Sequence, residues 1–579
     1  MADDQPHHQN AMPSSTEPSR HHRCPKATPI EHRSLPATLV QAWNERVRDE
    51  PDSTALIYFD GCVTVGDLDT LSNALAIAFQ ARGLGPGKVV GIYLQNIPAF
   101  VISLLAAWKV GAAALLLNPM YRRAELRRLI DDSRAVGLIC RDVDHDETRQ
   151  TVEGSGVGWI LTTCERDFQS ENDPRAFPDQ GDLGTIGDAD LTSIFDTASG
   201  EAPTPTPLRP NDLALLCYTS GTTGPAKGSM ATHRNILAAA QNFARWQNVN
   251  DTDRHLAVAP LFHITGAVAS AVTALLHRMP LVLINRTRPE LVLDAIRRHR
   301  VTTTIGSITV FNAVLALADA APEDLQSLRL VYSGGAPIPP ATIEMFARRF
   351  GIYIHNVYGM TETASTAIAV PAGAIAPTDP GSATLAIGVP MAAIQTRIVG
   401  RDGVILGTGG VGELQLRGPQ ITPGYLGNPQ ATAEAFDDGW LRTGDAAMQD
   451  DSGWIYLVDR IKDQINVSGF KVWPREVEDI LYEHPAVREA AVIGEPDPYR
   501  GEIVVAFVSL NPDAVTSPAA LLAFASERLA AYKKPRTIRI VDELPKTATG
   551  KIQRRELNRT HRLEPGDGHR EHSYLADDR

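Results

Sequence analysis

Residues 213–228 read LALLCYTSGTTGPAKG, an apolar run followed by a loop of small and hydroxylated residues. The apolar half has the length and character of a buried strand. In the loop, glycines let the backbone approach a ligand closely, and hydroxyls can donate hydrogen bonds. A flexible linker has no reason to follow a buried strand and to end in Lys-Gly. The pattern therefore predicts a strand-to-loop site for an anion.

The residues expected to bind phosphate are hydroxyls, glycines and one cation. They are Thr219, Ser220, Gly221, Thr222, Thr223, Gly224 and Lys227. Lys227 adds a mobile positive charge on a flexible stem. The loop is not the GxxxxGK[ST] phosphate loop, because Gly228 stands where that motif needs a hydroxyl.

Strand-like and helix-like segments alternate outward from this loop, from residue 36 to about residue 300. Val89–Tyr93 reads as a buried strand, Glu125–Ser133 as a helix followed by the strand Ala135–Cys140, and Pro289 opens another helix. Such alternation predicts parallel sheets covered by helices.

Two later regions follow different patterns. Residues 391–418 alternate apolar and polar residues around the turn signal Asp402-Gly403, which predicts an antiparallel β subdomain. Residues 461–560 read as a small α+β unit, with a helix from Pro474, strands at Ala490–Ile493 and Ile503–Leu510, and a helix near Ala519–Leu529.

Composition limits the classes of function. The net charge of −13 makes the chain a poor nucleic-acid binder, so a polyanionic ligand would need a local positive site.

The five cysteines form no CxxC pair, which favours reduced thiols over a zinc site or a disulfide framework. No apolar window has the length of a membrane span, and we expect a cytoplasmic protein. The longest apolar stretch, residues 99–117, is broken by Lys109 and Gly111, which predicts a buried helix followed by a strand. Residues 1–35 and 561–579 read as a disordered tail and a flexible tail.

Several motifs, in a fixed order, now make a family resemblance specific. The 218–228 loop, Asn356-Val-Tyr-Gly-Met-Thr-Glu-Thr363, Trp440-Leu-Arg-Thr-Gly-Asp445 and Pro545-Lys-Thr-Ala-Thr-Gly-Lys551 resemble the motifs of the adenylate-forming superfamily. That superfamily includes acyl-CoA synthetases, nonribosomal-peptide adenylation domains and luciferases. The resemblance covers roughly residues 36–560.

The resemblance implies an α/β fold with a large N-terminal domain and a small mobile one. The large domain, 36–460, would hold two α/β sheet subdomains and a β-barrel-like subdomain. The α+β C-terminal domain, 461–560, would act as a lid.

The resemblance also implies roles for residues in the nucleotide site. Tyr358 would stack on adenine, Thr361 would bond the α-phosphate and Glu362 would help to hold Mg²⁺. Asp445 would accept the ribose hydroxyls and Arg460 would contact the nucleotide. The neighbours Gly334, Asn356, Val357, Gly359 and Met360 complete the expected nucleotide site.

Further roles implied by the resemblance concern the lid and the acyl site. Lys551 would offset negative charge as the carboxylate attacks, and Lys462 lies at the hinge position of the family. The small pair Ser468-Gly469 would let a pantetheine arm pass. His263, in Pro260-Leu-Phe-His-Ile-Thr-Gly266, would gate the thiol tunnel; a purely structural histidine is the equal alternative.

These implications predict an ATP- and Mg²⁺-dependent ligase that forms an acyl-adenylate and passes the acyl group to coenzyme A. Peptide-synthetase adenylation domains usually place an aspartate near Phe262–His263 to pair with the substrate amine, but residues 256–270 contain no acid, which disfavours an α-amino acid. The resemblance implies that Ser333-Gly-Gly-Ala336 lines the acyl pocket, where small side chains leave room for a fatty or aryl acid. The main alternative is an acyl-AMP ligase that loads a separate carrier protein. A luciferase-like oxygenase and an inactive binding protein are the more distant alternatives. The oligomeric state, with a homodimer as one option, stays open.

Overall fold

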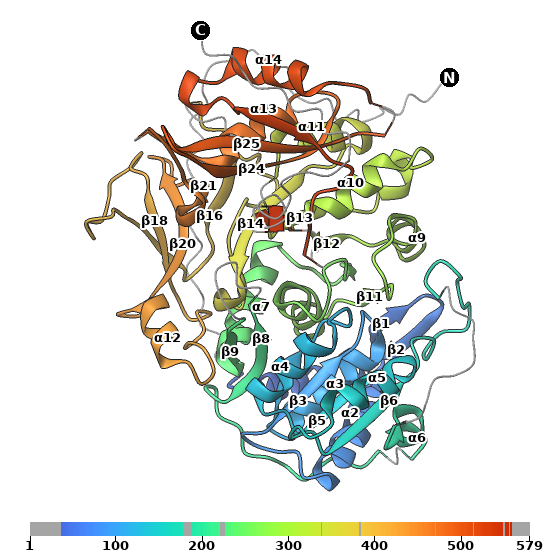
Figure 1. The fold of residues 1–579 in the computed structure, drawn as a ribbon. Helices are drawn as coiled ribbons and strands as arrows, with labels where there is room; N and C mark the ends of the chain where they lie inside the picture. Colours follow the sequence, from blue (N-terminus) through green and yellow to red (C-terminus); the bar gives the residue numbers. More distant parts are fainter. Residues whose placement is uncertain are drawn as a thin grey trace, which may run out of the picture.

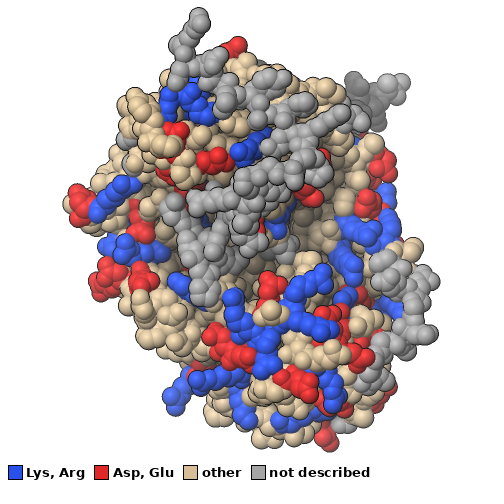
Figure 2. Space-filling view, viewed as in Figure 1, with Lys and Arg blue, Asp and Glu red and all other residues tan. Residues whose placement is uncertain are grey.

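The computed structural model describes residues 36–177, 187–197, 200–219, 226–336, 338–380, 384–468, 470–512, 514–547, 551–554 and 556–557. Both predicted tails lie outside the described residues. In Figure 1 the first sheet and its helices lie at one end of the molecule and the small C-terminal sheet at the other. Lys and Arg side chains are interspersed with Asp and Glu on the face shown in Figure 2.

The first sheet is parallel except at one edge, in the order β7-β6-β5-β3-β4-β8-β9. Its strands are β3 (Val89–Tyr93), β4 (Ala113–Leu116), β5 (Gly137–Arg141), β6 (Trp159–Thr163), β7 (Ala189–Asp190), β8 (Leu213–Tyr218) and β9 (Gly228–Thr232). Strands β8 and β9 pair antiparallel, so the chain turns back directly across residues 219–227. The phosphate-loop segment is thus the connection of an edge hairpin.

Helices cover both faces of this sheet. They are α1 (Leu39–Asp49), α2 (Val65–Ala81), α3 (Pro98–Lys109), α4 (Arg123–Ser133), α5 (His145–Val152) and α6 (Leu191–Asp196). Every residue of α3 is buried, and it packs with side chains of β3 and of the second sheet in one core cluster. A helix that is apolar all round needs cover on every side. The apolar stretch 99–117 is therefore an internal helix followed by β4, as predicted.

The second sheet begins with strands from two distant parts of the chain. They are β1 (Thr54–Tyr58), β2 (Gly61–Thr64), β10 (His255–Leu256), β11 (Leu281–Leu283), β12 (Thr303–Gly306), β13 (Leu330–Gly334), β14 (Ile354–Met360), β15 (Ser365–Ala369) and β16 (Ala386–Pro390). Strands β10, β12, β13 and β14 are parallel neighbours. Their carboxyl ends therefore meet at one edge of the sheet.

Helices and one π-helix flank this second sheet. They are α7 (His233–Trp246), the π-helix Thr265–Val272, α8 (Thr273–Leu276), α9 (Pro289–His299), α10 (Ile308–Ala316) and α11 (Pro340–Phe350). The helix predicted to begin at Pro289 is α9, in which proline occupies the first helical position.

The predicted antiparallel region continues the second sheet. Its elements are β17 (Gln395–Val399), β18 (Gly412–Arg417), α12 (Pro429–Ala435), β19 (Phe436–Asp437), β20 (Trp440–Gln449) and β21 (Ile455–Arg460). Strand β16 pairs with β21, so the hydrogen-bonded path is unbroken from β14 to β18. Strand β21 ends at Arg460, which places that side chain near the end of β14.

The C-terminal unit has its own sheet and its own apolar core. Its elements are β22 (Ile465–Val467), β23 (Phe470–Val472), α13 (Pro474–Tyr482), β24 (Val487–Asp497), β25 (Gly501–Leu510), α14 (Pro518–Arg528) and β26 (Thr537–Ile540). The predicted helices and strands of this unit are all present, with boundaries that shift by a few residues. The predicted strand Ala135–Cys140 likewise begins later, at Gly137.

Candidate active site

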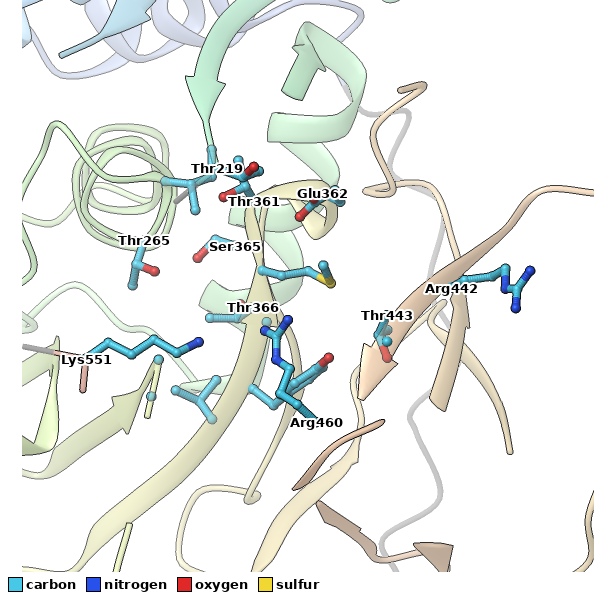
Figure 3. Close-up of a pocket in the computed structure, with 18 of the residues that line it drawn as sticks. Thr219, Thr265, Thr361, Glu362, Ser365, Thr366, Arg442, Thr443, Arg460 and Lys551 are labelled. Carbon is cyan, nitrogen blue, oxygen red and sulfur yellow. The ribbon is translucent and has the colours of Figure 1, made fainter. Parts of the chain in front are cut away.

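A cavity of about 1780 Å³ opens at the carboxyl ends of β12, β13 and β14. Gly306, Gly334 and Val357 line it from these strands, and Thr219 lines it from the end of β8. Ligands of open α/β sheets bind at this edge, because the loops there diverge and leave a crevice. The cavity extends to Arg442 and Thr443 of β20, to Arg460 at the end of β21 and to Lys551 of the C-terminal unit (Figure 3).

Glycine is required at two positions in the cavity wall. A Cβ at Gly334 would lie 2.3 Å from the carbonyl oxygen of Val357, and one at Gly359 would lie 1.8 Å from that of Ser365. Neither distance is compatible with a side chain, and both partners are backbone atoms that cannot move aside. Close strand pairing therefore explains both of these predicted site glycines.

One side of the cavity holds Thr219 and Lys227, at the two ends of the segment expected to bind phosphate. The amide of Thr219 donates to the carbonyl oxygen of Lys227 at 2.9 Å, which closes the base of the loop. Ser220, Gly221, Thr222, Thr223 and Gly224 lie outside the described residues. The ammonium of Lys227 lies 5.1 Å from the centre of the Tyr425 ring, a cation–π contact.

Thr361 and Glu362 follow β14 in a single 3-10 turn, and both line the cavity. The buried carboxylate of Glu362 accepts a hydrogen bond from the Tyr425 hydroxyl at 2.6 Å. Figure 3 shows Thr219, Thr361 and Glu362 together at one end of the cavity. The motif that suggested these residues in the sequence thus lies near Thr219, where the phosphate-binding segment begins.

The opposite side holds Tyr358, Asp445 and Arg460. The Tyr358 hydroxyl donates to one oxygen of Asp445 at 2.6 Å, and the guanidinium of Arg460 pairs with the other at 2.7 Å. Burial and the Asp445 charge raise the pKa of Tyr358 well above its usual value, so the phenol keeps its proton. The Asp445 charge also raises the pKa of Arg460. Three predicted nucleotide residues from separate motifs therefore form one hydrogen-bonded group.

Lys551 reaches the cavity from the C-terminal unit. Its backbone is held by Thr547, whose amide donates to the Lys551 carbonyl at 2.7 Å and whose hydroxyl accepts from the Lys551 amide at 3.1 Å. Burial, followed by the nearby charge of Arg460, lowers the pKa of Lys551 from 10.5 to about 8. The side chain extends toward the region of Arg460 in Figure 3. The cavity therefore contains a cation that loses its charge in mildly alkaline solution.

His263 lies at the border between the main cavity and a second one of about 1010 Å³. Burial, together with the Lys551 charge, lowers the pKa of His263 to about 4, so the imidazole is neutral. Beyond it the cavity wall consists of apolar, hydroxylated and glycine residues. They are Val258, Ala259, Pro260, Ile264, Thr265, Thr287, Pro289, Ile305, Gly306, Ser307, Thr309, Val310, Ala313, Gly334 and Gly335. We call this part of the cavity the uncharged recess, since its lining, as far as the structure describes it, carries no ionised group.

The other predicted residues lie in the wall of the second cavity or in the small domain. Asn356 and Asp445 line the second cavity but not the main one, and the residues that line both include Val357, Tyr358, Gly359, Met360, Thr361 and Lys551. Ser468 is not among the residues that line either cavity; its amide donates to Arg500 within the small domain. Gly469 and the Lys462 side chain lie outside the described part.

Sequence reasoning missed Tyr425 and Arg554. Tyr425 contacts two predicted site residues but belongs to no motif that the sequence singled out. Arg554 pairs with Glu478 at 2.6 Å and with Asp459, at the end of β21, at 3.5 Å. Its position three residues after Lys551 was the one signal available in the sequence.

The described residues form no helix with the length and apolar character of a membrane span. They also contain no group of three or more His, Cys, Asp or Glu side chains that could hold a metal ion.

Comparisons with known proteins agree with this geometry. The family model "AMP-binding enzyme" matches residues 43–426, and "AMP-binding enzyme C-terminal domain" matches residues 476–551. A long-chain-fatty-acid–CoA ligase of Bacillus subtilis is 33% identical, over 92% of this chain and 95% of its own. A sulfoacetate–CoA ligase of Cupriavidus necator is 34% identical, over 90% and 97%.

The fold is also that of solved relatives. The structure of an anthranilate CoA ligase in complex with anthranoyl-AMP superposes with a TM-score of 0.81 and 28% identity, covering 91% of this chain and 98% of that one. The chain therefore belongs to the AMP-binding enzymes, in the acyl-CoA synthetase family of the adenylate-forming superfamily.

Proposed function

We propose that the chain is an AMP-forming acid–CoA ligase for fatty or aryl acids. It would convert the acid to an acyl-adenylate with release of pyrophosphate, and then transfer the acyl group to coenzyme A. One observation carries the proposal: a single cavity joins the Lys227–Glu362 side, Lys551 and the uncharged recess. Tyr358 and Arg460 line the same cavity, and both bind Asp445, which lies in the wall of the second cavity. The cavity thus offers groups for the phosphates and the rest of the nucleotide, and an uncharged space for the acyl group.

In the first step a carboxylate oxygen of the acid attacks the α-phosphorus of ATP. The bond from that phosphorus to the bridging oxygen breaks, and pyrophosphate leaves with the electron pair. Two anions must approach, so positioning and charge neutralisation dominate the catalysis. Lys551 and Arg460 would stabilise the charge on the α-phosphate, and Lys227 would stabilise that on the departing phosphates; all three side chains line the cavity.

Glu362 is suited to help hold a magnesium ion. Mg²⁺ prefers oxygen ligands and is commonly bound by one or two carboxylates together with substrate phosphates. Glu362 provides one buried carboxylate on the phosphate side, which fits that arrangement. A bound Mg²⁺ would neutralise phosphate charge.

In the second step the sulfur of coenzyme A attacks the carbonyl carbon of the acyl-adenylate. The thiol proton goes to solvent, the carbon–oxygen bond to the phosphate breaks, and AMP leaves. The enzyme needs no nucleophile of its own. Cys217, beside the phosphate loop, is unsuited to be one, because burial raises the pKa of its thiol to about 12.

We propose a large domain over residues 36–460 and a lid over 461–560 that rotates about Lys462. The short 3-10 turn Ile461–Asp463 joins the last strand of the large sheet to the lid, which supports a hinge there. Proline at position 462 would restrict that turn. If the Lys462→Pro variant performed both half-reactions at the normal rate, the hinge assignment would be wrong.

The uncharged recess supports a substrate whose acyl group carries no second ionised group. A sulfonate or second carboxylate placed there would lose its hydration without gaining a cationic partner, at a cost of several kcal/mol. The sulfoacetate–CoA ligase relative shows that such acids occur in the family. Here we expect fatty and aryl acids to react in preference to them.

The decisive experiment is a panel of carboxylic acids with MgATP, assayed for pyrophosphate with and without coenzyme A. The proposal predicts coenzyme A-dependent thioester formation with a fatty or aryl acid and little reaction with dicarboxylates. The Lys551→Met variant should lose adenylation, whereas Lys88→Met, at an exposed lysine of the first sheet region, is the matched control.

Two outcomes would redirect the proposal. Pyrophosphate release without thioester formation would favour loading of a separate carrier protein. No release with any acid would refute ligase activity. Cytoplasmic localisation and a homodimer stay predictions.

A further inference from the structure

Tyr425 lies in the loop between β18 and α12, and its backbone is fixed to the strand that follows the phosphate loop. It forms an antiparallel bridge with Ser229 of β9. The amide of Met230 donates to the carbonyl of Gly424 at 3.0 Å, and the amide of Leu426 donates to that of Gly228 at 2.8 Å. The backbone on both sides of Tyr425 is therefore attached to residues 228–230, directly after the phosphate-binding segment.

The same segment is also tied to the turn that carries Glu362. The amide of Thr422 donates to the carbonyl oxygen of Glu362 at 2.9 Å, and the Thr422 hydroxyl lies 3.2 Å from that of Ser229. Gln420 donates to the carbonyl of Thr363 at 2.9 Å. Residues 420–425 thus connect two parts of the site that are far apart in the sequence.

The Tyr425 side chain contacts a cation and an anion at once. Its ring faces the Lys227 ammonium at 5.1 Å, and its hydroxyl donates to Oε1 of Glu362 at 2.6 Å. The ring is 7% exposed and packs edge-on against Phe436, so its orientation is fixed.

Lys227 and Glu362 carry opposite charges and line the same cavity, yet they form no ion pair with each other in the described part of the chain. A direct pair would neutralise both groups. A lysine so paired attracts phosphate less, and a carboxylate so paired is a weaker metal ligand.

We propose that Tyr425 is a positioning residue that holds Lys227 and Glu362 apart and keeps each available for magnesium–ATP. The ring provides a neutral face for the ammonium. The hydroxyl fixes one carboxylate oxygen and leaves the other for the cation. This inference rests on the proposed function, since it concerns the phosphate side of the same site.

Two substitutions separate the roles of the hydroxyl and the ring. Tyr425→Phe keeps the ring and removes the hydrogen bond to a charged group, so the Mg²⁺ concentration for half-maximal ATP–pyrophosphate exchange should rise about tenfold. The KM for the acid should not change, because the uncharged recess is untouched. Tyr425→Leu also removes the cation–π face and should raise the KM for MgATP further.

A double-mutant cycle tests the separation of the charges. If Lys227 and Glu362 pair when the ring is absent, Lys227→Met should cost less in the Tyr425→Leu background than in the normal protein. The control is Tyr456→Phe, because that buried tyrosine also donates to a carboxylate, Asp450 at 3.0 Å, but outside the cavity. It should leave the Mg²⁺ dependence unchanged.

Calorimetric titration of the full chain with MgATP gives a second readout that needs no acid substrate. Weaker binding in Tyr425→Phe than in Tyr456→Phe supports the inference. Equal binding and equal Mg²⁺ dependence in the two variants would overturn it, as would full additivity in the cycle. Absence of exchange with every acid, while MgATP still binds, would instead refute the proposed ligase activity.

Discussion

The lowered pKa of Lys551 predicts how adenylation depends on pH. Burial and the charge of Arg460 lower that pKa from 10.5 to about 8, so the required cation is lost as the pH rises through that value. At pH 7 roughly nine-tenths of the molecules carry the charge, and at pH 9 roughly one-tenth do. We therefore expect kcat/KM for ATP to fall about tenfold between these pH values, and about tenfold more for each further unit.

The assay must isolate the first half-reaction. ATP–pyrophosphate exchange with acid and without coenzyme A does so, and it avoids the titration of the coenzyme A thiol, since an unperturbed thiol has a pKa of about 8.5. The parameter to follow is kcat/KM, because it reports groups of the free enzyme. In kcat the decline should begin at higher pH, because bound phosphates favour the charged lysine.

Two variants identify the titrating group. Lys551→Arg carries a guanidinium that stays charged, so its profile should have no decline near pH 8. Lys551→Met should lower kcat at pH 7 by about 10²- to 10³-fold. A decline near pH 8 that persists in Lys551→Arg would show that another group titrates, and the reasoning from burial would be refuted.

Three further predictions follow from particular contacts. Asp445→Ala should raise the KM for ATP at least tenfold and hardly change the KM for the acid, because it removes the partner of Tyr358 and Arg460; equal changes in both KM values would contradict this. Asp459→Asn should weaken the pair with Arg554 across the domain junction and slow adenylation more than thioester formation from supplied acyl-adenylate, as single-turnover kinetics can check. Burial lowers the pKa of His255 to about 4, so the unfolded state binds more protons between pH 6.5 and 4, and stability should fall as the pH falls through this range. At pH 5.5 the loss is on the order of 1 kcal/mol for this residue, and thermal unfolding of His255→Gln should show a smaller difference between pH 7.5 and 5.5.

The sequence alone determined the local elements and the family. An apolar run as long as 99–117 predicts a buried helix and strand in any context, and proline at 289 and 474 marks helix starts through its own fixed φ. The motifs around Lys227, Glu362 and Lys551 were recognisable because a phosphate-binding loop and its partners need particular residue types in a fixed order. Each of these features is set by residues that lie close together in the sequence.

Only the tertiary structure determined which side chains of the site are in contact and which of them are charged. The position of Tyr425 between Lys227 and Glu362 depends on pairing between a distant loop and β9, which no local pattern records. The neutral state of His263 and the lowered pKa of Lys551 depend on burial by segments from both ends of the chain. Desolvation and charge–charge interactions act through space. The sequence could therefore name these residues, but their charge states depend on neighbours that only the folded chain brings into contact with them.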